Sequence, residues 1–325
     1  MTTESVCAAQ VRLLNGFEQD CRNRRFLPKT VRDYTADVGR YLTVCDDVGL
    51  FSENTHSYHD YKPTLMAFLD DLTQDGLSEH TIENYFSSIS AFYSYLIEED
   101  RAQLNPVEQF RKRYLCLYKT DREERQIVEQ DTLEEILDRM SGGYQAAALL
   151  LAKSAMRREE CLATVVGDFD LERQMLYLRK NPNARKRSNR RIPLDRQTVD
   201  VLRMYWKQRA DAGETVTAES AAFVTKRGKR IIGEHLRRAV EAAAMAAGAH
   251  DPKGPLCKRF TPHCFRHWAT TTLLASGMSP AYVDEIRGDK REGSREVYNH
   301  ISDRKLVEEL EKHMPVLRFT LHPYR

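Results

Sequence analysis

The stretch Thr261-Pro-His-Cys-Phe-Arg-His-Trp-Ala-Thr-Thr-Thr-Leu-Leu-Ala-Ser-Gly-Met-Ser279 carries the most structural information in this sequence. Pro262 suits the first turn of a helix, where its missing N–H costs no hydrogen bond. In such a helix His263 and Arg266 are three residues apart and project from one face, near the positively polarised N-terminus. These side chains can hold one phosphate group there. A surface helix with solvated charges is the alternative, and the surrounding sequence has to decide between the two.

Helical patterns flank this stretch on both sides. Thr132-Leu-Glu-Glu135 has the form of a capping box that opens a helix through Met140. Further helices are predicted at 143–166, 197–210, 233–248, 263–276 and 302–312. A short strand pair is expected at 174–179 and 189–194, joined by a basic turn over 180–188. The second part of the chain is therefore predicted to be mostly helical with a small sheet.

The first part of the chain has helical spacing throughout. Apolar side chains recur three, four and seven residues apart over 31–45 and 82–96, with a shorter run over 65–72. The aromatic residues of the second run offer an alternative interpretation as a base-stacking surface. Regular helical spacing favours core packing instead. We therefore expect a compact helical bundle.

The two parts are separated by a polar, heavily charged run between Gln109 and Gln126. It has no strong periodicity, which is typical of a linker. The predicted organisation is a helical domain over 1–115, a linker over 116–128 and a second domain over 129–325. The predicted fold class is mainly α with a small β-sheet, that is, α+β.

Composition excludes several classes of protein. The 325 residues are 41% hydrophobic and 30% charged, which is typical of an ordered globular chain. No window is apolar enough for a membrane span, and the first ten residues lack a signal-peptide pattern. The seven cysteines are scattered without a C-x-x-C pair, so we expect free thiols and a cytoplasmic location.

Charge is distributed unevenly along the chain. Residues 1–118 carry 12 Lys and Arg against 18 Asp and Glu, and the rest carry 38 against 30 of the 50 and 48 in total. A basic region is typical of proteins that bind nucleic acid.

Familiar catalytic motifs are absent from the sequence. It contains no G-x-x-x-x-G-K-[ST], H-E-x-x-H or G-x-S-x-G. Cys257, His263, Cys264 and His267 lack the two separated ligand pairs of a structural zinc site, so no metal is expected. What remains is a set of cations, histidines and a tyrosine.

Four segments resemble the tyrosine recombinase (lambda-integrase-like, phage integrase) family of site-specific DNA recombinases. The run 154–170, which starts Ser154-Ala-Met-Arg-Arg-Glu-Glu160, is similar to that family's first arginine box. The stretch quoted first is similar to its His-x-x-Arg box. Val297-Tyr298-Asn299-His300 is similar to its nucleophile box, and Arg287-Gly288-Asp289, which precedes it, is the fourth segment. The order and spacing of the boxes together are more specific than any one of them.

The resemblance implies roles for single residues. Tyr298 is the expected nucleophile, and Arg157, His263 and Arg266 contact the scissile phosphate, with Glu160 as a partner that orients an arginine. Lys180, in the turn after the first strand, is the expected general acid. The turn is longer than is common in the family, so Lys186 remains an alternative.

The chemistry of these residues supports the same roles independently of the family resemblance. Breaking a phosphodiester without a metal needs a nucleophile, cations that neutralise the phosphoryl charge, and an acid for the leaving oxygen. Guanidinium groups suit the non-bridging oxygens. A phenol stores the bond energy as a phosphoryl ester, so no nucleotide cofactor is needed. His267 and His300 are expected to be structural rather than catalytic.

One position departs from the family pattern. The residue nine places before the nucleophile is usually histidine or tryptophan, and here it is Asp289. A carboxylate donates no hydrogen bond unless protonated, and its charge repels phosphate. Asp289 is therefore expected either to orient a neighbouring cation or to impair the site.

A larger set of basic side chains is predicted to contact the DNA backbone without reading its sequence. It consists of Arg179, Arg185, Lys186, Arg187, Arg190, Arg191, Lys226, Arg227, Lys229 and Arg230.

The expected activity is cleavage and rejoining of DNA strands through a 3′-phosphotyrosyl intermediate, without metal or nucleotide cofactor. The resemblance implies a helical core-binding domain and a breaking–rejoining catalytic domain that form a C-shaped clamp on duplex DNA. It also implies a protein that is monomeric when free and tetrameric on DNA, with the apolar positions of 306–317 docking on a neighbour. No membrane and no small-molecule substrate are expected. Two alternatives stay open: a type IB topoisomerase, and a catalytically impaired DNA-binding protein on the same scaffold.

Overall fold

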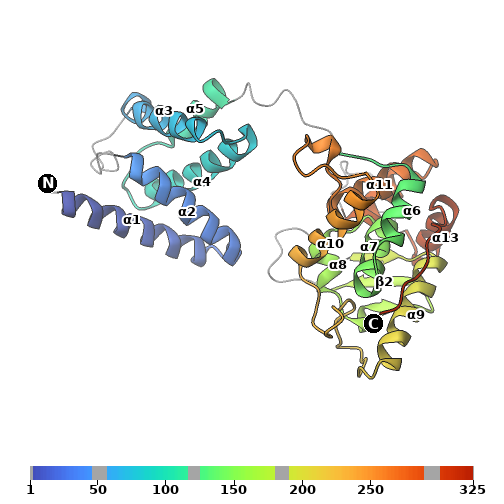
Figure 1. Cartoon of the computed structure of the whole chain (residues 1–325). Coiled ribbons are helices and arrows are strands. Elements are labelled where there is room, and N and C mark those ends of the chain that lie inside the picture. Colours follow the sequence, from blue (N-terminus) through green and yellow to red (C-terminus); the bar gives the residue numbers. More distant parts are fainter. Residues whose placement is uncertain (1–2, 46–56, 116–124, 180–189, 289–300, 325) are drawn as a thin grey trace. The chain divides into compact units, whose positions relative to one another are not determined.

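The chain forms two compact units, Met1–Arg122 and Glu123–Arg325. The computed structural model describes residues 3–45, 57–115, 125–179, 190–288 and 301–324. The described part is mostly helical, with one small sheet in the second unit (Figure 1), which confirms the predicted fold class. None of its helices is long and apolar enough to cross a bilayer.

The first unit is a helical bundle. Its helices are α1 (Thr3–Asn23), α2 (Pro28–Val44), α3 (Tyr58–Gln74), α4 (Glu79–Glu98) and α5 (Pro106–Phe110). Local sequence explains where they begin: Ser57 and Asp60 form a capping box for α3, and the Ser78 hydroxyl accepts a hydrogen bond from Thr81 N–H at the start of α4.

Aromatic side chains fill the core of this unit. Phe86, Phe92 and Tyr93 on α4 are fully buried, and Phe86 stacks on Phe110 with ring centroids 5.2 Å apart. The hydroxyls of Tyr41 and Tyr93 lie 2.7 Å apart in a buried hydrogen bond. The prediction that the aromatic run of α4 is a core face is therefore confirmed.

The first residues of the polar run after Gln109 belong to the helical bundle. After α5 the chain continues in a π-helical turn, Arg111–Leu115. Leu115 is buried in the same core as Val107 and Phe110, and these apolar contacts hold the turn in place. Residues 116–124 lie outside the described part.

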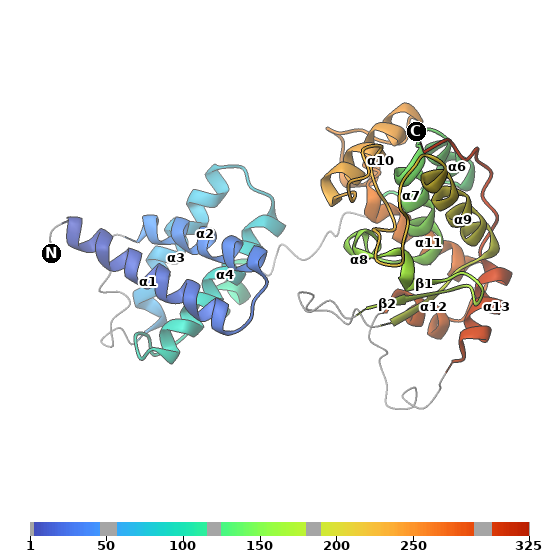
Figure 2. The ribbon, with the colours of Figure 1, turned by 90° about the horizontal axis from the view of Figure 1, so that it is seen from below.

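The second unit combines helices with a three-stranded antiparallel sheet. In chain order its elements are α6 (Gln130–Asp138), α7 (Gly142–Ser154), α8 (Arg158–Ala163), β1 (Phe169–Asp170), β2 (Met175–Leu178), β3 (Arg190–Pro193), α9 (Arg196–Asp211), α10 (Gly233–Ala246), α11 (Pro262–Ala275), α12 (Pro280–Arg287) and α13 (Asp303–His313). The strand order is β1-β2-β3, with Leu176 opposite Ile192. The predicted strand pair is confirmed, and α12 and α13 pack beside β3 (Figure 2).

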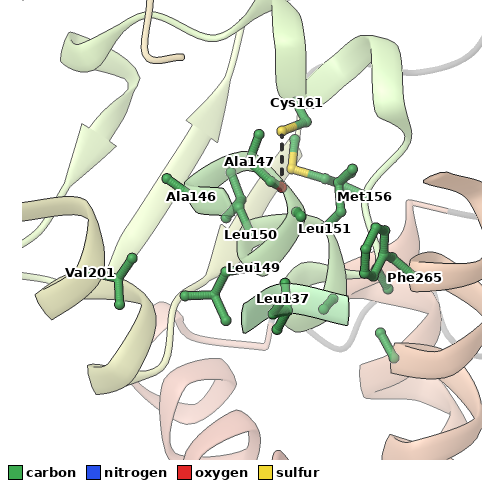
Figure 3. Close-up of a cluster of buried hydrophobic side chains, with 14 of the residues drawn as sticks. Leu137, Ala146, Ala147, Leu149, Leu150, Leu151, Met156, Cys161, Val201 and Phe265 are labelled. Atoms are coloured by element: carbon green, nitrogen blue, oxygen red, sulfur yellow. Dashed lines mark hydrogen bonds between the residues drawn. The ribbon is translucent and has the colours of Figure 1, made fainter. Parts of the chain in front are cut away.

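Helix α7 forms the centre of the second unit. It packs against α11 and α9, and every residue from Gln145 to Ser154 is buried. Its small side chains, such as Ala146 and Ala147, let neighbouring helices approach closely. Figure 3 shows this apolar cluster, in which Met156, Cys161 and Phe265 lie around α7.

Two sequence-based expectations about helix boundaries are wrong. The single helix expected at 143–166 is broken, because Ala155 adopts a left-handed conformation (φ 48°) and Arg157 is extended. Thr132 does not cap α6: the helix begins at Gln130, and its N-cap Glu129 makes no side-chain cap. Tertiary packing decided the first point, because the Ala155 carbonyl is bound by Arg266 of a distant helix. Helix α12 and the short strand β1 were not predicted.

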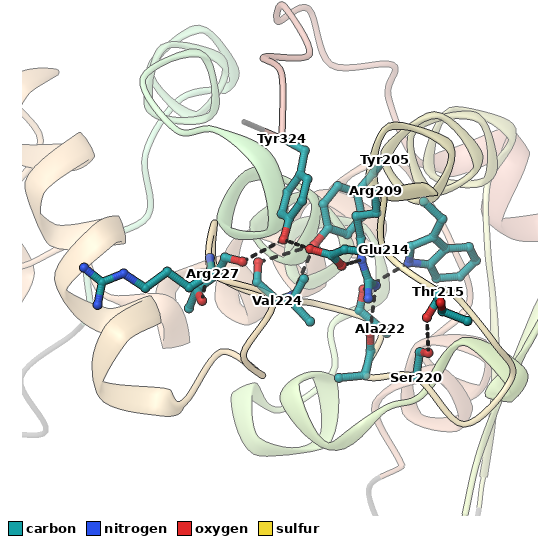
Figure 4. Close-up of polar contacts among 12 residues, drawn as sticks. Tyr205, Arg209, Glu214, Thr215, Ser220, Ala222, Val224, Arg227 and Tyr324 are labelled. Carbon is teal, nitrogen blue, oxygen red and sulfur yellow. Dashed lines mark hydrogen bonds and ion pairs between the residues drawn. The ribbon is translucent and has the colours of Figure 1, made fainter. Parts of the chain in front are cut away.

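The C-terminal segment packs on its own unit. Leu306, Leu310, Met314 and Leu317, the apolar positions expected to dock on a neighbour, are buried in the core of the second unit. At the end of the chain the Tyr324 hydroxyl donates to the Thr225 carbonyl over 2.8 Å and also contacts Glu214 (Figure 4). These apolar side chains are therefore not free for a neighbouring subunit in this structure.

Candidate active site

The corner between α7 and α8 positions Arg157. This residue is the N-cap of α8, and its backbone N–H donates to Glu160 Oε2 over 2.8 Å. Its guanidinium donates to Glu160 Oε1 over 3.1 Å. The carboxylate thus holds both the backbone and the side chain of Arg157, which restricts the directions that the guanidinium can take.

Arg266 lies on the first turns of α11 and is buried. Its Nη1 donates to the carbonyl of Ala155, two residues before Arg157, and to the carbonyl of Arg287 over 3.2 Å. The left-handed turn at Ala155 directs that carbonyl toward α11. One side chain therefore ties the α7–α8 corner and the end of α12 to the His-x-x-Arg helix.

Glu160 also binds a second arginine. Arg190, the first residue of β3, donates from Nη1 and Nη2 to the two carboxylate oxygens over 2.8 and 2.9 Å. Burial alone would raise the pKa of Glu160. The hydrogen bonds and charge of Arg190, with the N–H and charge of Arg157, outweigh burial and hold that pKa below its ordinary value. Glu160 is therefore ionised at neutral pH.

His263 and His267 lie one turn apart on α11, with ring centroids 4.7 Å apart. Partial burial, followed by the charges of Arg125, His267, Arg266 and Arg157, lowers the pKa of His263 to about 4. Burial and nearby arginines lower the pKa of His267 as well. Both rings are neutral at pH 7, so His263 can donate or accept a hydrogen bond without adding charge.

Sequence reasoning missed the contribution of Arg125. Its positive charge acts on both histidines, although it comes from the start of the second unit, far from α11 in sequence. It stood within the charged run that was interpreted as a linker. No local sequence signal separates it from the other charges of that run.

Several predicted site residues lie outside the described part of the chain. These are the nucleophile Tyr298, Asp289, His300, both lysine candidates Lys180 and Lys186, and the basic residues Arg185 and Arg187. Residues that flank two of those gaps contact the start of β3. Gly288 packs against Arg190, and the carbonyl of Ile301 accepts a hydrogen bond from Arg191.

The set of basic side chains expected on DNA divides in the structure. Lys226, Arg227 and Lys229 are exposed on a turn, as a backbone contact requires. Arg230 is exposed too, but its Nη1 donates to the carbonyls of Leu162 and Thr164.

The other described members of the set are held by carboxylates. Arg179 pairs with Asp168, and Arg191 pairs with Asp303. Arg190 is buried against Glu160, so its expected role as a phosphate contact is corrected: its guanidinium is already bound within the protein.

The site is a cluster of two arginines, two neutral histidines and an ionised glutamate on α8 and α11. Within the described ranges, no group of three or more His, Cys, Asp or Glu side chains is placed to hold a metal ion. Such a cluster suits the binding of a phosphate.

Comparison with known protein families matches both units. The sequence model described as "Phage integrase family" matches residues 126–305, and "Phage integrase, N-terminal SAM-like domain" matches residues 14–100. The chain belongs to the phage integrase family. Members of this family are tyrosine recombinases, enzymes that transfer DNA strands at specific sites, and this chain is one of them.

Individual relatives cover nearly the whole chain. It is 25% identical to the tyrosine recombinase XerD of Oceanobacillus iheyensis, over 88% of this chain and 92% of the relative. It is also 25% identical to the tyrosine recombinase XerC of Corynebacterium glutamicum, over 88% of this chain and 86% of the relative.

Two solved structures share the fold. The Tn1549 transposon integrase in complex with transposon right end DNA has a TM-score of 0.63 at 18% identity, over 92% of this chain and 98% of that one. A lambda integrase dimer bound to a core site has a TM-score of 0.63 at 15% identity, over 93% and 99%.

Proposed function

We propose that this recombinase cleaves DNA with Tyr298. The phenol gives up its proton as its oxygen attacks the scissile phosphorus, and a 3′-phosphotyrosyl ester forms. The bond to the 5′ oxygen breaks, and that oxygen leaves as a hydroxyl after taking up a proton. A 5′ hydroxyl from a second strand then attacks the ester, which restores the phosphodiester and the free phenol. The energy of the phosphodiester bond is kept in the phosphotyrosyl ester, so no nucleotide cofactor is required. The arginines supply the positive charge that a metal ion would otherwise bring to the phosphate.

The observation that carries this proposal is the convergence of Arg157, His263 and Arg266. Arg266 is fixed to the Ala155 carbonyl and Arg157 to Glu160, which brings the two guanidinium groups to one corner of the fold. Both charges act on His263 at the N-terminus of α11. The two arginines neutralise the non-bridging oxygens, while neutral His263 hydrogen-bonds the same phosphate.

The proton for the leaving oxygen comes from a lysine. Lys180 is the proposed donor because it stands two residues after Leu178, the last residue of β2. Lys186 is the alternative in the same connection between β2 and β3. Asp289 is proposed to orient one of the neighbouring cations. Substituting each lysine by methionine separates the two candidates. A leaving group of lower pKa needs no proton donor, so it should restore the cleavage rate only in the variant that has lost the true donor.

The proposed partner is double-stranded DNA, and the proposed assembly on it is a homo-tetramer. The first unit, within residues 1–115, serves as the core-binding domain, and residues 129–325 serve as the catalytic domain, joined by 116–128. The match of residues 14–100 to the SAM-like domain supports this division. The shared fold with integrases solved on DNA supports the partner.

Covalent trapping tests the proposal. A duplex that carries a nick close to the cleavage site loses the short fragment after cleavage, so the phosphotyrosyl adduct accumulates. Pooled genomic and mobile-element DNA supplies candidate sites. We expect wild-type protein to form an adduct that resists boiling in detergent, and Tyr298→Phe to form none while it still binds DNA.

Sequencing the DNA that is trapped identifies the site. An adduct that persists in Tyr298→Phe would assign the nucleophile to another residue. Binding without any adduct across all substrates would contradict cleavage itself.

A further inference from the structure

Arg190 is held differently from the other basic residues near the sheet. Its side chain is 7% exposed and Glu160 is 14% exposed, whereas the neighbouring Arg179 is 60% exposed. A guanidinium buried to this degree cannot follow a DNA backbone, so its charge serves another purpose within the protein.

The contacts of Arg190 extend in two directions. Toward α8, its two Nη atoms bind both oxygens of Glu160 over 2.8 and 2.9 Å. Toward α12, its Nε donates to the carbonyl of Ile286 over 3.2 Å. It thus uses three of its five N–H donors on two elements that are far apart in sequence.

Through Glu160, the contact with Arg190 also affects the position of Arg157. The oxygen that receives Arg190 Nη1 also receives the guanidinium of Arg157, and the other oxygen receives the Arg157 backbone N–H. A carboxylate held by a bidentate arginine cannot rotate freely. The position of Arg157 therefore depends on Arg190.

The second constraint concerns the end of α12. Gly288 ends this helix with φ +67°, and a Cβ atom there would lie 2.5 Å from Cδ of Arg190. Only glycine accepts both the left-handed conformation and this close approach. Arg190 therefore packs against the residue from which the chain leads to Tyr298, ten positions later.

We propose that Arg190 is a positioning residue for strand cleavage, which orients Arg157 through Glu160 and fixes the start of the nucleophile segment through Ile286 and Gly288. Its role is positioning rather than catalytic, because the contacts described above run to Glu160, Ile286 and Gly288. This inference rests on the function proposed above, because it assigns to Arg190 a part in the cleavage step.

Lysine is the informative replacement. Arg190→Lys keeps the positive charge and most of the volume, but an ammonium group cannot bind two carboxylate oxygens and a carbonyl in one plane. Displacement of a reacting group by about 1 Å lowers rates by about 100-fold. We expect that fall in the single-turnover rate of adduct formation at saturating nicked duplex, with little change in the half-saturating DNA concentration.

Arg209 provides the matched control. It is 4% exposed and pairs with Glu214, which is 15% exposed, over 3.0 Å. Its other acceptors are the carbonyls of Ala221 and Ala222 (Figure 4), none of which belongs to the site. Arg209→Lys likewise removes a buried guanidinium that binds one carboxylate and backbone carbonyls, so it should lower the melting temperature without changing the cleavage rate of the folded protein.

A second variant tests the contact from its other end. Glu160→Gln keeps the shape of the side chain but removes the charge, and it should slow cleavage in the same way. Because both changes act through one contact, Arg190→Lys combined with Glu160→Gln should be little slower than the slower single variant. Thermal melts and DNA binding of each protein verify that it is folded.

The outcomes separate this inference from the function on which it rests. If wild-type protein forms no adduct, the proposed function fails. If wild type forms the adduct and both variants cleave at its rate, or slow no more than Arg209→Lys, then Arg190 is structural and the positioning role is refuted. Loss of folding in Arg190→Lys leaves the decision to Glu160→Gln, whose normal rate would equally refute the role.

Discussion

The two units of this protein differ in what their cores contain. The first is filled with aromatic rings, and Ser88 is its one buried polar residue in the described part of the chain. The core of the second is mainly aliphatic and rich in alanine, yet it buries Lys153, Asp195, Arg209 and Arg266. Both are mostly helical, so secondary structure does not explain the difference.

The difference follows from what each core has to hold. Apolar packing stabilises an arrangement but tolerates small shifts, whereas charged hydrogen bonds fix direction and are costly when broken. In the second unit such bonds lead to the site, as Arg266 and the Glu160 pairs show, or to the C-terminal segment. In the first unit the rings hold a bundle, and none of its charged side chains in the described part is fully buried.

The largest effect is expected from Lys153→Met in the second unit. Lys153 is 1% exposed, and its Nζ lies 2.8 Å from Asp195 and also binds the Pro315 carbonyl. Removing it leaves a buried carboxylate without its cation, which costs about 3–5 kcal/mol. Trp206 and Trp268, the two tryptophans of the chain, both lie in this unit, so urea unfolding followed by tryptophan fluorescence measures the loss.

The control for this prediction is the double variant Lys153→Met with Asp195→Asn, which should recover part of the stability because no unpaired charge remains. A loss below about 1 kcal/mol in the single variant would show that the buried charges of the second unit contribute no more than a surface pair.

The next effect concerns catalysis. Arg266→Lys keeps a charge on α11 but cannot bind the Ala155 and Arg287 carbonyls and a phosphate together. We expect adduct formation to slow by about 10²- to 10³-fold. Single-turnover trapping measures this, with Arg238→Lys on the exposed face of α10 as a control expected to match wild type. Equal rates of adduct formation in the two variants would show that Arg266 takes no part in cleavage.

A smaller effect is expected in the aromatic core. Tyr93→Phe removes one partner of the buried Tyr41–Tyr93 hydrogen bond but leaves the ring packing intact. A neutral hydrogen bond contributes about 1 kcal/mol, so peptides of the first unit should exchange amide hydrogens only slightly faster. Hydrogen exchange measured by mass spectrometry resolves the two units. A loss of stability as large as that in Lys153→Met would show that the two cores do not differ in how much a buried polar contact contributes.

The smallest effect is a pH dependence in the second unit. Because the pKa of His263 is lowered from 6.5 to about 4, the folded state resists its protonation. The contribution to stability is complete above pH 6.5 and is lost as the pH falls toward 4, since the unfolded chain then binds more protons. Solvent screens this side chain, so the effect is modest.

The difference in melting temperature between wild type and His263→Gln measures this effect, and it should change over that pH window. Bound DNA should raise the pKa of His263, because a phosphate stabilises the imidazolium. An NMR titration with an ordinary pKa in the free protein would contradict the prediction.

Regular periodicity made most of the fold predictable. The faces of α2 and α4, the helix that starts at Pro262 and the β2–β3 pair each follow from spacing and from turn or cap residues within a few positions. The break at Ala155 was not predictable in the same way. Nothing near that residue demands φ 48°; the demand comes from Arg266, 111 positions later, which binds its carbonyl.

The candidate site likewise has features that the sequence predicts and features that it does not. The sequence by itself determined the types of residue and their order: Arg157 with Glu160, His263 with Arg266, and Tyr298. Local spacing places Arg157 beside Glu160 and His263 beside Arg266, because residues three apart share a helix face.

Only the tertiary structure decided which charges face one another. Arg190 and Arg191 are adjacent and identical in type, yet one is buried on Glu160 and the other pairs with Asp303. Successive residues of a strand point to opposite faces, and the partners on those faces come from α8 and α13. Long-range packing, which no local pattern encodes, placed Arg190 on the same carboxylate that holds Arg157.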